Sequence, residues 1–157
     1  MIRAYRESDL ETLRAITAIC FDGVSIDQNI ERRYGVIAGK GWQWRKASHI
    51  DADVAAHPGG IFVYELEGEV IGYVTARPNR DTRIGWIPNL SVLPGHQGQG
   101  IGKALIGKAV DYLRQEGMRF VRIETIEQNE TACALYPRLG FQEVARQVHY
   151  VMPIEQS

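Results

Sequence analysis

Alternating apolar residues mark the strands that the chain is expected to form. Two such runs, Ile61–Leu66 and Val70–Thr75, flank the dipeptide Glu67-Gly68, and this spacing predicts a β-hairpin. The same pattern predicts further strands at Ile2–Tyr5, Phe120–Thr125, Phe141–Arg146 and Val148–Met152.

Another strand is predicted from Ile84 to Leu93, although Pro88 lies inside it. Because proline has no N–H to donate to a ladder, this strand should carry a bulge or an exposed edge at Pro88. Pro94-Gly95 then ends the strand.

Helical spacing of apolar residues appears first after Ser8. Ser8 and Glu11 form the Ser-x-x-Glu pattern of a capping box, so the first helix is expected to begin at Ser8. Leu13 and Ile16 continue its apolar face. The stretch Phe21–Val54 mixes aromatic residues, charges and glycines, and it indicates one or two short helices and a loop.

Two more helices are expected in the second half of the chain. An apolar stripe predicts a helix from Ile101 to Glu116, with Gly117 as its C-terminal stop. Asn129 is expected to cap a shorter helix, Glu130–Arg138. Strands that alternate with helices in this way indicate an α/β fold.

Composition narrows the class of protein. The 157 residues, 45% of them hydrophobic and 24% charged, suit one soluble domain over residues 1–157. A net charge of −1 gives no indication of nucleic acid or an anionic membrane surface as a partner. Cys20 and Cys133 are too few for a disulfide framework, and no His or Cys spacing predicts a metal site. Without a signal peptide or a long apolar run, a cytoplasmic protein is expected.

The strongest chemical signal is a glycine-rich loop between the predicted strand and the helix that begins at Ile101. It reads Gln97-Gly98-Gln99-Gly100-Ile101-Gly102-Lys103. The first amides of a helix have no intrahelical partners and lie at the positive end of its dipole. Alternating glycines remove the Cβ atoms that would keep a phosphate away from those amides. The loop therefore predicts an anion site; its alternative role is a tight turn that only packs strand against helix.

Two common phosphate motifs do not fit this loop. The Walker pattern needs a Ser or Thr after Gly-Lys to hold magnesium, and Ala104 follows Lys103. The dinucleotide fingerprint Gly-x-Gly-x-x-Gly fails because Gly98 and Gly100 are followed by Lys103 where the third glycine belongs.

The pattern Gln97-x-x-Gly100-x-Gly102 between a strand and a long helix resembles the coenzyme A motif of the GCN5-related N-acetyltransferase (GNAT) superfamily. A later signature of that superfamily is matched by Asn129, by Leu135-Tyr136 and by Leu139-Gly140-Phe141. The order of the predicted elements agrees too, so the resemblance covers nearly the whole chain.

The resemblance implies a single GNAT domain with a mixed, mostly antiparallel twisted sheet flanked by helices. The sheet would splay open between Ile84–Leu93 and Phe120–Thr125, and acetyl-CoA, with no metal, would lie in the opening. The family's pattern assigns the pantetheine arm to the backbone of Leu90, Ser91 and Val92 and to Asn129. It assigns the pyrophosphate to the loop that starts at Gln97, through the amides of Gly98, Gln99, Gly100, Ile101, Gly102 and Lys103.

The resemblance also implies the roles of two side chains in transfer. Tyr136 stands where the family places the acid that protonates the leaving thiolate, and a phenol with a pKa near 10 keeps its proton at neutral pH. Its alternative role is only to pack beneath the pantetheine. The bulged strand, Trp86-Ile87-Pro88-Asn89, lacks the glutamate that many members carry there. Glu124 matches the base position of the branch that acetylates protein N-termini. Its alternatives are a structural ion pair, for instance with Arg122, or an amine that arrives neutral.

The expected reaction is direct transfer of acetyl from acetyl-CoA to a primary amine of a small molecule or peptide. A non-catalytic acyl-CoA sensor or regulatory module is the alternative, and an unrelated nucleotide-binding domain is a third reading. A homodimer is compatible with the family, but nothing in the sequence fixes it. The acceptor is expected to meet the stretch Phe21–Val54 and the region around His149-Tyr150, where the candidates are Asp22, Asp27, Glu31, Trp42, Trp44 and Tyr150. Their alternative roles are solvated acids and core aromatics, and His149 itself is expected to be a surface or packing histidine.

Overall fold

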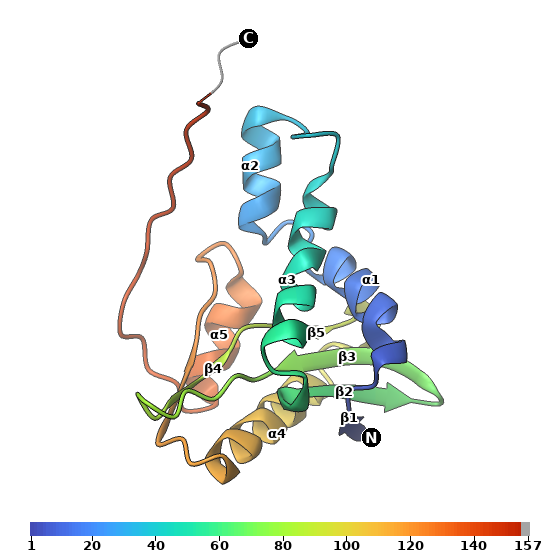
Figure 1. Ribbon diagram of the computed structural model, residues 1–157, viewed down its shortest axis with the longest axis vertical. Helices are drawn as coiled ribbons and strands as arrows, with labels where there is room; N and C mark the ends of the chain where they lie inside the picture. Colours follow the sequence, from blue (N-terminus) through green and yellow to red (C-terminus); the bar gives the residue numbers. More distant parts are fainter. Residues whose placement is uncertain (155–157) are drawn as a thin grey trace.

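A four-stranded antiparallel sheet forms the centre of the computed structural model, which describes residues 1–154 (Figure 1). Its order is β1-β2-β3-β5, and the strands are β1 (Ile2–Ala4), β2 (Ile61–Leu66), β3 (Glu69–Thr75) and β5 (Leu90–Val92). The predicted hairpin of β2 and β3 is confirmed. Its turn residues Glu67 and Gly68 have φ angles of 52° and 84°, the positive values that a two-residue hairpin turn requires.

A second, two-stranded sheet lies beside the first. It pairs β4 (Ile84–Ile87) in parallel with β6 (Phe120–Ile123). The single strand expected from Ile84 to Leu93 is therefore two strands, β4 and β5, which belong to different sheets. The break falls at Pro88 and Asn89, where the missing N–H of proline prevents a continuous ladder. The expected splaying next to Phe120–Thr125 is thus observed.

Helices cover both faces of the central sheet. On one side lie α1 (Leu10–Cys20), α2 (Ile26–Tyr34) and α3 (Trp42–Ala56), and on the other lies α4 (Ile101–Gln115) (Figure 1). Leu13 of α1 and Leu105 of α4 are fully buried, each within its own hydrophobic cluster. Helices α2 and α3 are the one or two helices predicted for the stretch Phe21–Val54, and α3 continues two residues beyond it.

The helices of the second half follow the sequence closely. α4 begins at the predicted residue and ends before Gly117, whose φ of 86° suits a glycine after a helix. α5 (Glu130–Arg138) is capped as expected, because Asn129 Oδ1 accepts a hydrogen bond from the amide of Ala132 at 3.2 Å.

The start of the first helix differs from the prediction. A 3₁₀ turn at Glu7–Asp9 precedes α1, and Ser8 does not cap it. The carboxylate of Asp9 instead accepts the amide hydrogen of Arg6 at 2.7 Å and two hydrogen bonds from the Arg3 guanidinium at 2.9 Å. Asp9, held by these charge-assisted bonds, therefore lies at the N-terminus of α1, where the Ser-x-x-Glu pattern had predicted Ser8.

The prediction of strands at Phe141–Arg146 and Val148–Met152 is wrong. The last described residues, 142–154, form no strand; we call them the C-terminal arm. Figure 1 shows the arm leaving the end of α5 and running past it toward α2. Alternating apolar residues suit a strand, but a strand also needs a neighbour to accept its hydrogen bonds, and the arm meets none within residues 1–154.

Candidate active site

Asn89 fixes the place where the two sheets separate. Its amide donates to Thr75 Oγ1 at 3.0 Å, its carbonyl accepts from the Thr75 amide at 2.9 Å, and its side-chain nitrogen donates to Asp53 Oδ2 at 2.6 Å. The two bonds to Thr75 hold the start of β5 against β3, and the bond to Asp53 ties it to α3, while β4 turns away to pair with β6. A wedge therefore opens between β5 and β6.

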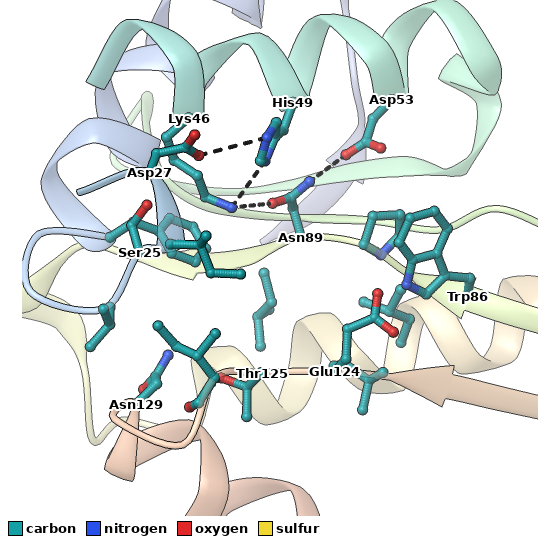
Figure 2. Close-up of a pocket in the computed structure, with 18 of the residues that line it drawn as sticks. Ser25, Asp27, Lys46, His49, Asp53, Trp86, Asn89, Glu124, Thr125 and Asn129 are labelled. Atoms are coloured by element: carbon teal, nitrogen blue, oxygen red, sulfur yellow. Dashed lines mark hydrogen bonds and ion pairs between the residues drawn. The ribbon is translucent and has the colours of Figure 1, made fainter. Parts of the chain in front are cut away.

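A cavity of about 440 Å³ occupies the wide end of this wedge. Its walls are the segment Phe21–Asp27, the inner face of α3, the β4–β5 break, the end of β6 and the start of α5 (Figure 2). Of the predicted site residues, the structure brings Leu90, Glu124, Asn129 and Tyr136 together around it.

The glycine-rich loop lies at the other end of β5. Gln97 Nε2 donates to the carbonyl of Val92 at 2.9 Å, which ties the loop to the last residue of that strand. Gly98 and Gly100 have φ angles of 79° and 82°, and a Cβ at either would meet nothing within 4 Å. Their backbone conformation, and not crowding by neighbours, therefore makes glycine suitable here.

The amides that follow Gln97 are available to a ligand. Among residues 1–154, no protein group accepts a hydrogen bond from the amides of Gly98–Lys103, and the turn Gln97–Gly100 is exposed. Unpaired amides at the start of a helix are an anion site. β5 joins this site, next to Val92, to the cavity, which Leu90 lines. An elongated ligand along β5 would reach both ends.

Tyr136 lies where the cavity meets α5. Burial raises the pKa of its phenol to about 12, with a smaller contribution from Cys133. The ring packs edge-on against Phe141, with 6.0 Å between the ring centroids. The hydroxyl therefore keeps its proton over the whole physiological pH range.

Glu124 lines the same cavity from the end of β6. Its carboxylate accepts a hydrogen bond from Arg122 Nη1 at 2.8 Å. This ion pair with Arg122 is the structural role that the sequence leaves open as an alternative to that of a general base. Arg122 in turn lies over the ring of Trp86, 4.6 Å from its centroid. The carboxylate thus reaches the cavity as one half of an exposed ion pair.

One face of α3 supplies polar groups that the sequence analysis did not select: Lys46, His49 and Asp53 (Figure 2). Lys46 Nζ lies 3.3 Å from His49 Nδ1 and 3.5 Å from Asn89 Oδ1. Burial lowers the pKa of Lys46, and burial together with the Lys46 charge lowers the pKa of His49. The signal was present in their spacing of three and four residues, which places them on one side of a helix.

Asp53 anchors this face of α3 to the sheets. It is 2% exposed and holds Arg77 Nη2 at 2.5 Å in addition to the Asn89 side chain. A buried carboxylate requires such partners, because removal of its charge from water is costly. The pair therefore positions Asn89, and with it the opening of the wedge.

The acceptor candidates from the sequence separate into two groups. Asp27 lines the cavity, and so does His149, which the sequence predicts to be a surface or packing histidine. The others lie elsewhere: Asp22 binds Gln28, Glu31 binds the amide of Trp42, Trp42 is buried in the core, Trp44 is exposed beneath Lys40, and Tyr150 is exposed on the arm. The pattern along the chain could not distinguish the side of α2 and α3 that faces the sheets.

Within residues 1–154, no three His, Cys, Asp or Glu side chains are arranged to hold a metal ion. The helices of the same residues are all too short or too polar to cross a bilayer.

A sheet that splays where a strand breaks into β4 and β5, with unpaired helix-start amides at one end of β5 and a cavity at the other, is an arrangement that suits a long anionic ligand. Residues 25–141 match the acetyltransferase (GNAT) family. The chain belongs to this family.

Comparisons with individual proteins agree with this family assignment. The chain is 36% identical over 95 residues to an uncharacterized N-acetyltransferase, MJ1207, of Methanocaldococcus jannaschii, covering 54% of this chain and 39% of that protein. It is 34% identical over 84 residues to the mycothiol acetyltransferase of Streptomyces coelicolor, covering 54% and 27%. The chain thus spans well under half the length of these two relatives.

A solved structure shares the fold. It is the PaiA N-acetyltransferase of Thermoplasma acidophilum in complex with coenzyme A. It superposes with a TM-score of 0.72 at 18% identity, covering 90% of this chain and 89% of that one.

The Asp53–Arg77 pair gives a prediction about stability. Arg77→Met leaves the Asp53 carboxylate buried without its cation, and we expect the free energy of unfolding to fall by about 3 kcal/mol in urea titrations. Arg114→Met, which removes an exposed pair with Asp111 on α4, should cost less than about 1 kcal/mol. Equal losses in the two variants would show that the buried pair has no special structural role.

Proposed function

We propose that residues 1–157 act as one acetyltransferase domain that moves acetyl from acetyl-CoA to a primary amine. The observation that carries the proposal is the placement of β5, which has the free amides after Gln97 at its end and the cavity beside Leu90 at its start. The coenzyme A complex of the PaiA N-acetyltransferase, which shares the fold, supports acetyl-CoA as the cosubstrate. Because Tyr136 and Glu124 both line the cavity, a catalytic role is favoured over that of a sensor.

In this proposal the amides of Gly98–Lys103 bind the pyrophosphate, and the exposed Lys103 adds a positive charge beside it. One edge of Leu90–Val92 pairs with β3, and the other edge, which no strand within residues 1–154 covers, pairs with the pantetheine arm. The side-chain nitrogen of Asn129 donates to the same arm, because its oxygen already caps α5.

Transfer follows from the groups around the cavity. The neutral amine attacks the thioester carbonyl carbon, the carbon–sulfur bond breaks, and the leaving thiolate takes the phenolic proton of Tyr136 to give free coenzyme A. Glu124, directly or through a water molecule, takes the proton that the attacking nitrogen loses. The burial that raises the pKa of Tyr136 keeps this acid protonated until the leaving group forms.

The loop is tested by coenzyme A affinity. Gly100→Ala places a Cβ on a residue with a φ of 82° and next to the amides, so we expect about tenfold weaker binding of coenzyme A by calorimetry. A pantetheine derivative without the pyrophosphate should bind the variant and the wild type equally. Gly107→Ala, on the exposed side of α4, is the matched control and should bind both ligands normally. Unchanged coenzyme A affinity in Gly100→Ala would refute the assigned pyrophosphate site.

The acid is tested by turnover. Tyr136→Phe should lower kcat by about a hundredfold while the affinity for coenzyme A stays unchanged, because only the proton donor is lost. Since the phenol pKa is about 12, the wild type should lose no activity through Tyr136 between pH 6 and about pH 9. Release of the coenzyme A thiol measures kcat and its pH dependence, and calorimetry measures the affinity for coenzyme A.

Tyr112→Phe is the control for this test. Burial also raises the pKa of Tyr112 to about 12, but its hydroxyl binds His57 and Glu116 away from the cavity, so its removal should leave kcat unchanged. Full turnover by Tyr136→Phe would eliminate the acid role. Glu124→Gln should alter the pH dependence of kcat and leave coenzyme A binding intact.

A further inference from the structure

The charges around the cavity do not balance. Its carboxylates are Asp27, Asp53 and Glu124, and an arginine lies beside each of them: Arg45 at 3.5 Å, Arg77 at 2.5 Å and Arg122 at 2.8 Å. Lys46 lines the same cavity and, within residues 1–154, has no carboxylate oxygen within 4.0 Å of its nitrogen. One positive charge is therefore left without a partner.

Neutral groups hold the Lys46 ammonium in place. It lies near Asn89 Oδ1 and His49 Nδ1, and 4.0 Å from the centroid of the Phe21 ring. An ammonium has three hydrogens to donate, and these two contacts leave one for a ligand. Figure 2 shows the ammonium on the α3 side of the cavity, across from Glu124 and Asn129.

The surroundings of Lys46 favour an anionic ligand. Burial lowers the pKa of Lys46, which means that the cation lacks full compensation for its lost water. His49 adds no charge at neutral pH, because its pKa is lowered too. A carboxylate placed at the ammonium would supply the missing partner.

We propose that the acceptor amine carries a carboxylate, which Lys46 binds while the amine faces Tyr136 and Glu124. This inference rests on the proposed acetyltransferase function. The acceptor is then a small amino acid or a close analogue. The cavity volume of about 440 Å³ is in the range of small-molecule sites. The amino terminus of a protein, whose first carbonyl is an amide, has no carboxylate at this position.

The test compares amino acids with their carboxamides as acceptors. The wild type should show a kcat/KM at least tenfold higher for the acid of each active pair. Lys46→Met should lower kcat/KM for the acid at least tenfold, mainly through KM, and leave the carboxamide within twofold. Lys46→Arg should restore part of the preference. Lys40→Met is the control, because Lys40 lies over Trp44 outside the cavity.

Two results would overturn this inference. One is a wild type whose kcat/KM is as high for the carboxamides as for the acids. The other is a Lys46→Met variant whose kcat/KM falls equally on both kinds of substrate. If no amine is acetylated, calorimetry of N-acetylamino acids and their carboxamides in the presence of coenzyme A replaces turnover, and equal or absent binding overturns the inference. Failure to bind coenzyme A at all would instead refute the proposed function.

Discussion

Pro88 cannot donate a backbone hydrogen bond, and Asn89 forms its bonds with Thr75 and Asp53. Together they end β4 beside β6 and start β5 beside β3. The rest of the site depends on this separation. If the strand ran straight through, the sheet would close, and no space would remain between β5 and β6 for a ligand.

The separation is maintained by charge as well as by backbone geometry. Asp53 reaches from α3 to Asn89 and Arg77, and the Arg77 guanidinium lies 5.2 Å from the centroid of the Trp86 ring. Helix α3 is thereby joined to Asn89, just before β5, and through Arg77 to Trp86 in β4. The same helix presents Lys46 and His49 to the cavity, so the element that holds the wedge open also supplies part of its chemistry.

The two ends of β5 have different physical requirements. The loop after Gln97 needs backbone freedom and unpaired amides, and it is exposed. The cavity end needs shielding from water, because an acid such as Tyr136 and a cation such as Lys46 interact more strongly with a ligand in a less polar environment. A cofactor lying between them would have its charged part near solvent and its reacting part inside.

Features that depend on neighbours along the chain could be predicted from the residues alone. The hairpin turn at Glu67-Gly68, the glycine loop and the Asn129 cap are local hydrogen-bond and φ requirements, and Pro88 removes a donor wherever it stands. Which distant groups meet depends on how the whole chain packs, and the sequence did not predict it. Asp9, and not Ser8, lies at the start of the first helix because Arg3 binds it, and Asp53 bonds to Asn89 across 36 residues. Within residues 1–154, Lys46 has no carboxylate oxygen within 4.0 Å of its nitrogen. The arm at residues 142–154 has the pattern of strands but forms none, because pairing needs a second edge that residues close in sequence cannot supply.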